Sequence, residues 1–218
     1  MNIGTGNSHP HQGSPLLRKG IELANAGSAL ILLHGRSASA QDIIGLSREF
    51  SLPGDMIVLA PQAAGSIWYP HRLVDPLESN EPYLTSALRR VSEVVEMLEQ
   101  VGIPAELILI GGFSQGASLA IEFVLRSGRR WGGLLAFSGG YIWPLGQPRG
   151  LAGSLAGTPV FLGCSDKDPF IPLARVEETA TLLQAMGAQV DKHIYPGMEH
   201  TVNQEEIDAA QQIITAIH

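Results

Sequence analysis

Short apolar runs alternate with longer amphipathic stretches along this chain. Five of the runs are apolar at nearly every position, which is typical of strands covered on both faces. A sixth run, Val190–Tyr195, is more polar and is expected nearer a sheet edge. The five apolar runs are Ala29–Leu33, Met56–Ala60, Leu107–Ile110, Gly133–Phe137 and Pro159–Leu162.

Helical spacing occupies the intervals between these runs. Residues 84–98 carry apolar side chains three and four positions apart, with Pro82 near the start and Gly102 just past the end. The alternation of strand and helix predicts an α/β fold whose mostly parallel sheet is covered by helices on both faces. The same spacing predicts helices at Ala117–Leu125, Leu173–Met186 and Glu205–Ile217.

The 218 residues carry no repeat and no interdomain linker, so a single domain over 1–218 is expected. Residues 1–20 are expected to form a loose N-terminal segment. The stretch Tyr141–Thr158, interrupted by Gly and Pro, is expected to be a surface loop. Residues 63–80 and 141–158 are expected to form the rim of a cleft, and no insertion is long enough for a large lid.

Composition excludes several classes of protein. Hydrophobic residues make up 44 % of the chain, which is enough for a core, and 14 Lys and Arg against 21 Asp and Glu give a net charge of -7. This balance argues against nucleic-acid binding and against stable association with a membrane. The single cysteine, Cys164, excludes an intrachain disulfide. With no signal peptide in sight, a cytoplasmic protein is expected.

Residues Gly112–Gly116 read Gly-Phe-Ser-Gln-Gly, a G-x-S-x-G sequence. The motif follows one predicted strand and precedes one predicted helix, the setting of a nucleophile elbow. A sharp turn there strains the backbone at Ser114, and side chains at 112 and 116 would collide with neighbouring backbone. A Gly-rich turn with an incidental serine is the competing interpretation.

A serine needs a base, and the base needs a carboxylate. Of the histidines after Ser114, His193 lies in a predicted strand and His218 ends the chain, whereas His200 lies in a loop after a strand. Such loops carry the chemistry of α/β sheets. Asp166 and Asp168 both follow the strand at 159–162. Asp168 is favoured because Pro169 stiffens its backbone and Ile171 can shield it, but residue chemistry alone leaves both open.

Two backbone N–H groups are expected to stabilise a developing oxyanion. Gln115, which follows the serine, supplies one. The loop after the first apolar run supplies the other, and Arg36 is the natural candidate within it. The side chain of Arg36 has two open roles, a surface ion-pair partner or an attractor of acidic substrates. His34 is expected to brace the loop.

These segments together resemble the carboxylesterase/phospholipase family of small serine α/β-hydrolases, which includes the acyl-protein thioesterases. The resemblance implies that Ser114 is the nucleophile, Asp168 the acid and His200 the base, with Arg36 and Gln115 as oxyanion donors. It therefore favours Asp168 over Asp166. The motifs that carry it are Leu33-His34-Gly35, Gly112–Gly116, Asp168–Pro172 and Gly197–His200.

The loop His34-Gly-Arg-Ser-Ala38 departs from the His-Gly-Leu-Gly-Asp of the thioesterases and looks more like a bacterial His-Gly-Arg branch. By the resemblance, Trp68 and Tyr69 lie near the acyl site, with an aromatic packing pair as the alternative. Phe170 and Ile171 are expected on the leaving-group side. No metal-binding, dinucleotide or P-loop motif is present, so neither a metal nor another cofactor is expected.

The sequence therefore predicts a serine carboxylesterase that acts on small-molecule esters of short to medium acyl chains. A lysophospholipase or an acyl-protein thioesterase is the alternative within enzymes. A non-catalytic α/β-hydrolase-fold binding protein is the alternative outside them, and a complete set of Ser114, Asp168 and His200 argues against it. The sequence does not distinguish a monomer from a homodimer.

Overall fold

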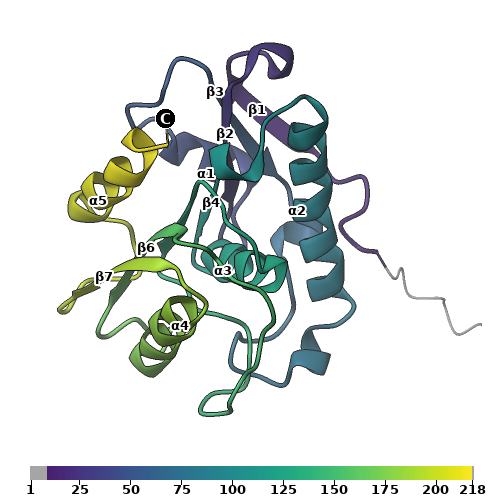
Figure 1. The fold of residues 1–218 in the computed structure, drawn as a ribbon. Helices are drawn as coiled ribbons and strands as arrows, with labels where there is room; N and C mark the ends of the chain where they lie inside the picture. Colours follow the sequence, from purple (N-terminus) through teal and green to yellow (C-terminus); the bar gives the residue numbers. More distant parts are fainter. Residues whose placement is uncertain (1–8, 218) are drawn as a thin grey trace, which may run out of the picture.

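A seven-stranded sheet forms the centre of the computed structural model, which describes residues 9–217. Its strand order is β1-β3-β2-β4-β5-β6-β7 (Figure 1), and every neighbouring pair is parallel except β1 with β3. The strands are β1 (Leu16–Gly20), β2 (Ser28–Leu33), β3 (Met56–Pro61), β4 (Ile108–Phe113), β5 (Gly133–Phe137), β6 (Pro159–Ser165) and β7 (Gln189–Tyr195).

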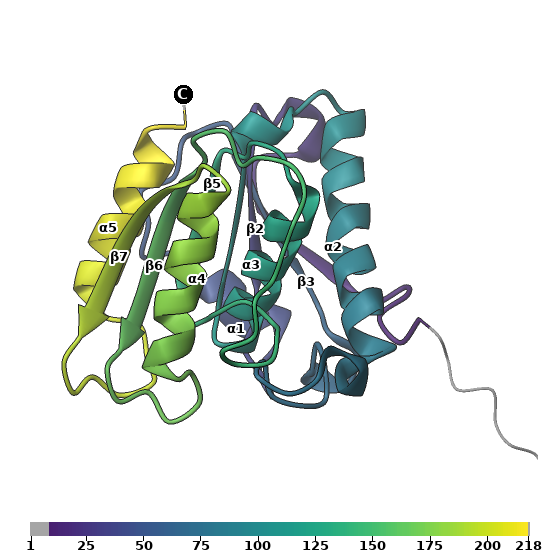
Figure 2. The same ribbon diagram turned by 60° about the horizontal axis from the view of Figure 1, so that its bottom comes forward.

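Helices cover both faces of this sheet. Helices α2, α3 and α4 pack on one face, and α1 and α5 pack on the other, as Figure 2 shows. Side chains of β2 alternate between these two apolar layers, because successive residues of a strand point to opposite faces. The helices are α1 (Ala40–Leu46), α2 (Tyr83–Gln100), α3 (Gln115–Ser127), α4 (Leu173–Ala185) and α5 (Gln204–Thr215).

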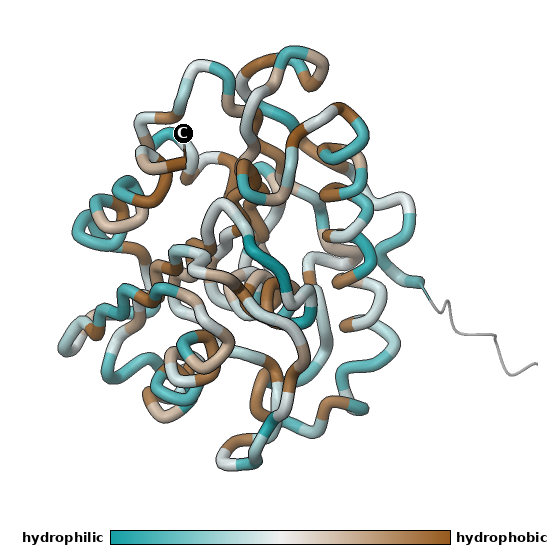
Figure 3. Tube along the Cα trace, viewed as in Figure 1, coloured by the Kyte–Doolittle hydropathy of each residue, from teal (hydrophilic) through white to brown (hydrophobic). Residues whose placement is uncertain are grey.

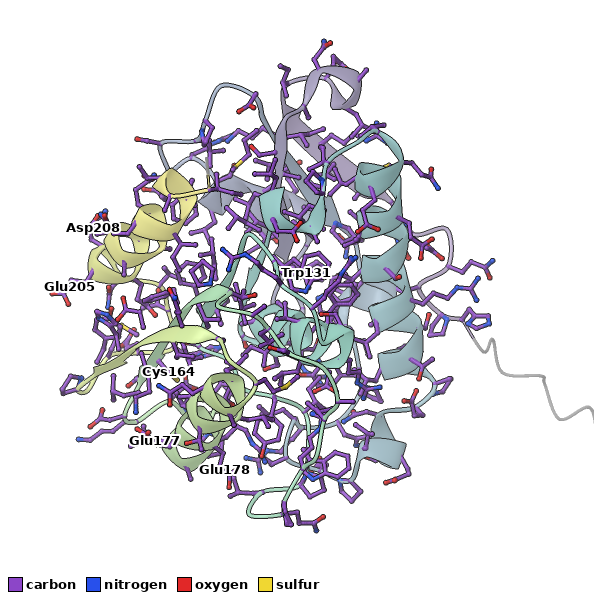
Figure 4. All side chains as sticks on the ribbon, viewed as in Figure 1. Trp131, Cys164, Glu177, Glu178, Glu205 and Asp208 are labelled. Carbon is purple, nitrogen blue, oxygen red and sulfur yellow. The ribbon has the colours of Figure 1, made fainter. Side chains whose placement is uncertain are left out.

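The hydropathy of the chain follows this layering. In Figure 3 the hydrophobic stretches gather in the central strands, and the helices alternate between hydrophobic and hydrophilic positions. Figure 4 labels Glu205 and Asp208 on the outer side of α5, and Glu177 and Glu178 on α4. These four carboxylates therefore lie on helices and not in the strands.

The predicted alternation of strands and helices is confirmed, including the edge position of β7. Two elements went unpredicted, β1 and α1. A capping box at Ser39 and Asp42 starts α1, and this sequence signal could have revealed that helix. Among residues 9–217, no helix is long and apolar enough to cross a membrane.

The expectation of a loose segment over 1–20 is wrong for its second half, while residues 1–8 lie outside the described part of the chain. Strand β1 pairs with β3 at the edge of the sheet. His11 is completely buried and bonded on both ring nitrogens, to the carbonyl oxygen of Trp68 and to the N–H of Ala64. A polar segment is thus anchored by hydrogen bonds to distant backbone, which hydrophobic periodicity does not register.

The segment 141–158 is irregular, as predicted, but it is tied to the protein by a buried carboxylate. Glu122 of α3 accepts hydrogen bonds from the Arg149 side chain at 2.6 and 2.7 Å and from the N–H of Ile142 at 3.2 Å. A buried charge is tolerable when it is paired and hydrogen-bonded in this way. The loop therefore has a fixed attachment beside the helix that carries the site.

Candidate active site

Ser114 lies at the sharp turn between β4 and α3. Its backbone has φ 56° and ψ −118°, a conformation that few non-glycine residues adopt. A Cβ atom at Gly112 would lie 2.5 Å from the carbonyl oxygen of Leu33, and one at Gly116 would come closer still to that oxygen. The steric argument for glycine at both positions is therefore confirmed, and the turn projects Ser114 from the carboxyl edge of the sheet.

Three side chains from separate loops meet at this turn. The imidazole of His200 lies with Nε2 2.8 Å from the Oγ atom of Ser114 and with Nδ1 2.6 Å from the Oδ2 atom of Asp168. With Nδ1–H donating to the carboxylate, Nε2 is free to accept the serine proton. His200 lies between the rings of Phe113 and Phe170, whose centroids are 4.8 and 4.9 Å away. This geometry is suited to activating a serine hydroxyl.

Both oxygens of the Asp168 carboxylate are hydrogen-bonded. Its side chain is fully buried; Oδ1 accepts the N–H groups of Phe170 and Ile171 at 2.9 and 3.0 Å, and Oδ2 faces His200. Burial raises the pKa of this carboxyl, but the hydrogen bonds from His200 and the two N–H groups outweigh it, so the pKa lies below its ordinary value. Asp168 is thus kept ionised and correctly oriented.

The competing aspartate has a different position. Asp166 accepts the N–H of Gly197 at 2.7 Å, so it ties the loop that carries His200 to the end of β6. His193 bonds to Asp191 on the exposed edge strand, away from Ser114, and His218 lies outside the described residues. Of these candidates, the structure brings only Asp168 and His200 to the serine.

The two expected oxyanion donors flank Ser114. Gln115 is the first residue of α3, where an N–H group has no acceptor within the helix. The loop containing Arg36 lies alongside the turn, since a Cβ atom at Gly35 would be 3.6 Å from the Cβ of Ser114. Within residues 9–217 the backbone N–H of Arg36 makes no hydrogen bond. Both N–H groups are therefore available to a ligand at the serine.

A cavity of about 650 Å³ opens over Ser114 and His200. Tyr69, Phe170 and Ile171 line it, as expected for residues that contact a substrate. Trp68 does not: it is fully buried outside the cavity lining, with its ring 5.0 Å from that of His34 and its Nε1–H donating to the carbonyl oxygen of His34. The alternative of an aromatic packing position is the correct one for Trp68.

Sequence reasoning missed one neighbour of the triad. The thiol of Cys164, on β6 (labelled in Figure 4), lies 3.8 Å from the Oδ2 atom of Asp168. Burial, together with the nearby carboxylate of Asp168, raises the pKa of this thiol to about 12, so it is protonated at neutral pH and donates to the carboxylate. No motif marks Cys164, because the contact depends on a turn four residues long.

The described residues contain no cluster of three or more side chains suited to holding a metal ion. The functional groups gathered at the cavity are a hydroxyl, an imidazole, a carboxylate and backbone amides. These are the kinds of group from which an acyl-transfer site can be built.

The order of the strands and the helices on both faces define an α/β-hydrolase fold. The chain belongs to the phospholipase/carboxylesterase family, whose sequence model matches residues 24–218. The expected family and α/β-hydrolase fold are thereby confirmed.

A crystal structure of a phospholipase/carboxylesterase from Dyadobacter fermentans DSM 18053 is similar over 93 % of this chain and 96 % of that one, with 40 % identity and a TM-score of 0.87. The carboxylesterase of Bacillus cereus shares the fold with a TM-score of 0.72, at 20 % identity over 95 % of this chain and 96 % of that chain.

Among curated proteins, acyl-protein thioesterase 1 of Debaryomyces hansenii is 33 % identical over 124 residues, which is 56 % of this chain and 53 % of that protein. The corresponding protein of Neurospora crassa is 34 % identical over 116 residues, 52 % of this chain and 47 % of its own length. The matched segments thus span about half the length of these relatives.

Proposed function

We propose that this protein is a serine carboxylesterase that hydrolyses small-molecule esters through an acyl-enzyme on Ser114. His200 takes the proton of Ser114 as its Oγ attacks the ester carbonyl, and the carbonyl π electrons move onto the oxygen. Collapse of this intermediate expels the alcohol, which receives the proton from His200. Water then attacks the acyl-enzyme with His200 again as base.

One observation carries the proposal most directly: the unbroken hydrogen-bonded path from Ser114 through His200 to Asp168. Both bonds are within the range expected for a working nucleophile and base, even without a substrate. A protein that only bound a ligand would have no need for a strained serine in line with a buried His–Asp pair. Membership of the family supports ester hydrolysis independently.

The oxyanion of the intermediate would lie between the backbone N–H groups of Arg36 and Gln115. Preorganised donors of this kind account for a large share of catalysis, and loss of one costs roughly 10²–10³ in kcat. Asp168 holds the imidazole in the tautomer that accepts from Ser114 and stabilises the imidazolium that forms. The exposed ring of Phe170 at the mouth of the cavity suits contact with the leaving alcohol.

Short to medium acyl chains are the proposed substrates. The buried phenol of Tyr69 forms part of the cavity wall, and burial raises its pKa, so it remains a neutral, mostly apolar surface. Each methylene that finds an apolar wall adds about 0.8 kcal/mol of binding, or nearly fourfold in affinity. The proposed preference for short to medium chains predicts a kcat/KM that rises, levels and then falls with chain length.

The test is turnover of p-nitrophenyl esters from two to about twelve acyl carbons, below each ester's micelle concentration. Ser114→Ala should lose several powers of ten in kcat while keeping the wild-type circular dichroism and Tm. A folded Ser114→Ala protein with near-wild-type kcat would refute the acyl-enzyme.

A steady rise of kcat/KM through twelve carbons in the wild type would keep the esterase but restore the lysophospholipase or acyl-protein thioesterase interpretation. The curated relatives named acyl-protein thioesterase 1 make that the second candidate. A wild-type protein that turns over no ester and forms no acyl-enzyme would favour the non-catalytic alternative.

A further inference from the structure

We propose that the side chain of Arg36 is a positioning residue: with the side chain of Gln115 it holds one carbonyl oxygen, that of Tyr69, and so sets the spacing of the two oxyanion N–H groups. This inference rests on the proposed function, because it concerns the residues proposed as oxyanion donors. It also gives the guanidinium of Arg36 a role that neither an ion pair nor substrate attraction describes.

The carbonyl oxygen of Tyr69 connects the two donors directly. It accepts a hydrogen bond from Nη2 of Arg36 at 2.8 Å and another from Nε2 of Gln115 at 2.7 Å. The two residues are 79 positions apart in the sequence and come from different loops, yet their side chains meet on one atom. A shift of that oxygen would therefore change the positions of both proposed oxyanion donors, the N–H groups of Arg36 and Gln115.

Neighbouring contacts fix the same peptide. Oε1 of Gln115 accepts the N–H of Trp68 at 2.9 Å, so both ends of the Gln115 amide bond to one stretch of backbone. Nη2 of Arg36 also lies 3.0 and 3.2 Å from the carbonyl oxygens of Pro70 and His71. One guanidinium nitrogen thus faces three successive carbonyl groups, a concentration of acceptors that suits a positive charge.

Residues 63–71, which we call the brace segment, hold the rest of the Arg36 loop as well. The N–H of Ser37 donates to the carbonyl oxygen of Ser66 at 2.8 Å. Nε2 of His34 accepts the N–H of Ala63 at 3.0 Å. The loop from His34 to Ser37 is therefore hydrogen-bonded to the brace segment on both sides of Arg36.

The need for such a brace follows from the backbone. The N–H of Gln115 is oriented by the start of a helix buried against the sheet. Arg36 lies between β2 and α1 without regular structure, and neighbouring Ser37 has φ 63°. The turn Gly35–Ala38 holds the peptide that carries this N–H, because the carbonyl oxygen of Gly35 accepts the N–H of Ala38 at 3.2 Å and lies 2.8 Å from Nδ1 of His34. The hydrogen bond from Arg36 to Tyr69 then fixes the position of this turn relative to the donor at the start of α3.

The test compares Arg36→Lys and Arg36→Ala with the matched pair Arg48→Lys and Arg48→Ala. Arg48 is also exposed, follows α1, and has no side-chain hydrogen bond or ion pair within residues 9–217. Lysine keeps the charge but cannot reproduce the planar guanidinium. We expect Arg36→Lys to lower kcat for a neutral p-nitrophenyl ester about tenfold with KM changed less than about twofold, because a misplaced group near the chemistry costs rate.

A trifluoromethyl ketone reports on the oxyanion directly. Ser114 Oγ adds to its carbonyl carbon, His200 takes the proton and the ketone oxygen becomes an oxyanion. Its affinity should fall in Arg36→Lys and Arg36→Ala by the same factor as kcat/KM, and guanidinium ion should restore part of the activity of Arg36→Ala. The Arg48 variants should match the wild type in all three measurements.

Two results would contradict the proposed positioning role of Arg36. The first is an Arg36→Lys protein with wild-type kcat and ketone affinity. The second is a loss confined to KM for anionic esters and abolished by salt, which would assign the guanidinium to substrate attraction. Arg36→Lys decides the matter if Arg36→Ala fails to fold. Ser114→Ala tests the proposed function separately. If Ser114→Ala is inactive and Arg36→Lys is unaffected, the positioning role of Arg36 is rejected and the proposed function stands.

Discussion

The two sides of Ser114 are held in different ways. On the base side, residues 166–171 and 196–206, short-range bonds orient the carboxylate and begin α5: Asp168 accepts from residues two and three positions further along the chain, and Asn203 and Glu206 form a capping box. Two longer-range bonds join the two segments, His200 with Asp168 and the N–H of Gly197 with Asp166. On the oxyanion side, the bonds that join residues 34–37 and Gln115 to the brace segment connect positions 29 to 47 apart in sequence. Short-range bonds there are accepted by the carbonyl oxygens of Gly35, Ala63 and Ala64.

This difference has a physical consequence. The turn that holds Asp168 is bonded locally and can keep its shape when a distant segment moves, so a substitution there should act through the one group it orients. The oxyanion side is a network in which His34, Trp68 and Gln115 share neighbours, and double substitutions there should not be additive. Two sets of buried groups should also respond oppositely to pH: Glu206 at the start of α5, whose pKa is raised, and His11 and His34, whose rings bond to the brace segment and whose pKa values are lowered.

The largest effect is expected from the aspartates of the base side. Asp168→Asn should lower kcat by about 10⁴, because an amide favours the wrong imidazole tautomer of His200 and cannot stabilise the imidazolium. Asp166→Asn keeps an oxygen that can accept the N–H of Gly197, so its kcat should fall less than about tenfold. Steady-state kinetics on p-nitrophenyl acetate compare the two. Equal losses, or the reverse ranking, would transfer the orienting role to Asp166.

A second prediction concerns Glu206, the buried carboxyl at the start of α5. Burial raises its pKa to about 7, although the N–H of Asn203, bonded to Oε2 at 3.0 Å, offsets part of that rise. The folded protein therefore binds more protons here than the unfolded chain does between its ordinary pKa, about 4.5, and 7. The free energy of unfolding should fall as pH rises through that window, by up to about 3 kcal/mol.

Glu206→Gln removes this titration while keeping an acceptor for Asn203. We expect its stability relative to wild type to increase between pH 5 and pH 8, as measured by urea unfolding at both values. Glu205→Gln, one residue earlier and exposed, is the matched control and should show no such trend. A Glu206→Gln protein whose advantage is the same at both pH values would show that Glu206 is ionised in the folded state throughout.

A smaller effect of opposite sign is expected on the oxyanion side. Burial lowers the pKa of both His11 and His34, although backbone carbonyls and, for His34, Asp42 oppose it, while the charge of His34 adds to the lowering at His11. Each ring accepts a backbone N–H, from Ala64 and Ala63 respectively, which requires a neutral nitrogen. The unfolded chain binds more protons below about pH 6.5, so stability should fall as pH drops through that range.

His11→Asn offers an oxygen near the position of Nδ1 without a basic group. It should cost about 1 kcal/mol at pH 7, through loss of the bond to Trp68, but should weaken the decline of Tm between pH 7 and pH 5. His71→Asn, an exposed histidine of the same region, is the control and should leave that decline unchanged. If Tm falls equally in His11→Asn and wild type between pH 7 and pH 5, His11 does not contribute to the loss of stability in acid.

The contrast between the two sides also explains what the sequence could reveal. Ser114 and His200 each lie in a short segment whose local chemistry is visible: small residues around the serine, and a loop after a strand for the histidine. Proline after Asp168 favours that residue, but local chemistry leaves Asp166 open, and only the family resemblance separates the two. The placement of Trp68 was missed because its burial depends on His34 and His11, far away in sequence. Likewise, the sequence around Arg36 does not indicate that its guanidinium contacts three backbone carbonyl groups.

The same reasoning applies to the fold. Strands buried on both faces are readable as continuous apolar runs, and six of the seven strands were predicted from such runs or from alternation. Strand β1 was missed because it is a half-buried edge strand containing Arg18 and Lys19, and it gains its place by pairing with β3. Edge strands of this kind carry little hydrophobic signal.

The central claim is that Ser114 is the nucleophile, and covalent trapping tests it most directly. A fluorophosphonate should transfer its phosphonyl group to Oγ of Ser114, with loss of fluoride and of the serine proton to His200. After trypsin digestion the adduct should lie in peptide 91–126, and fragment ions should place it on Ser114 instead of Ser92 or Ser118. We expect one adduct per chain, absent in Ser114→Ala and formed orders of magnitude more slowly in His200→Ala. An adduct on another residue, or unchanged labelling of Ser114→Ala, would contradict it.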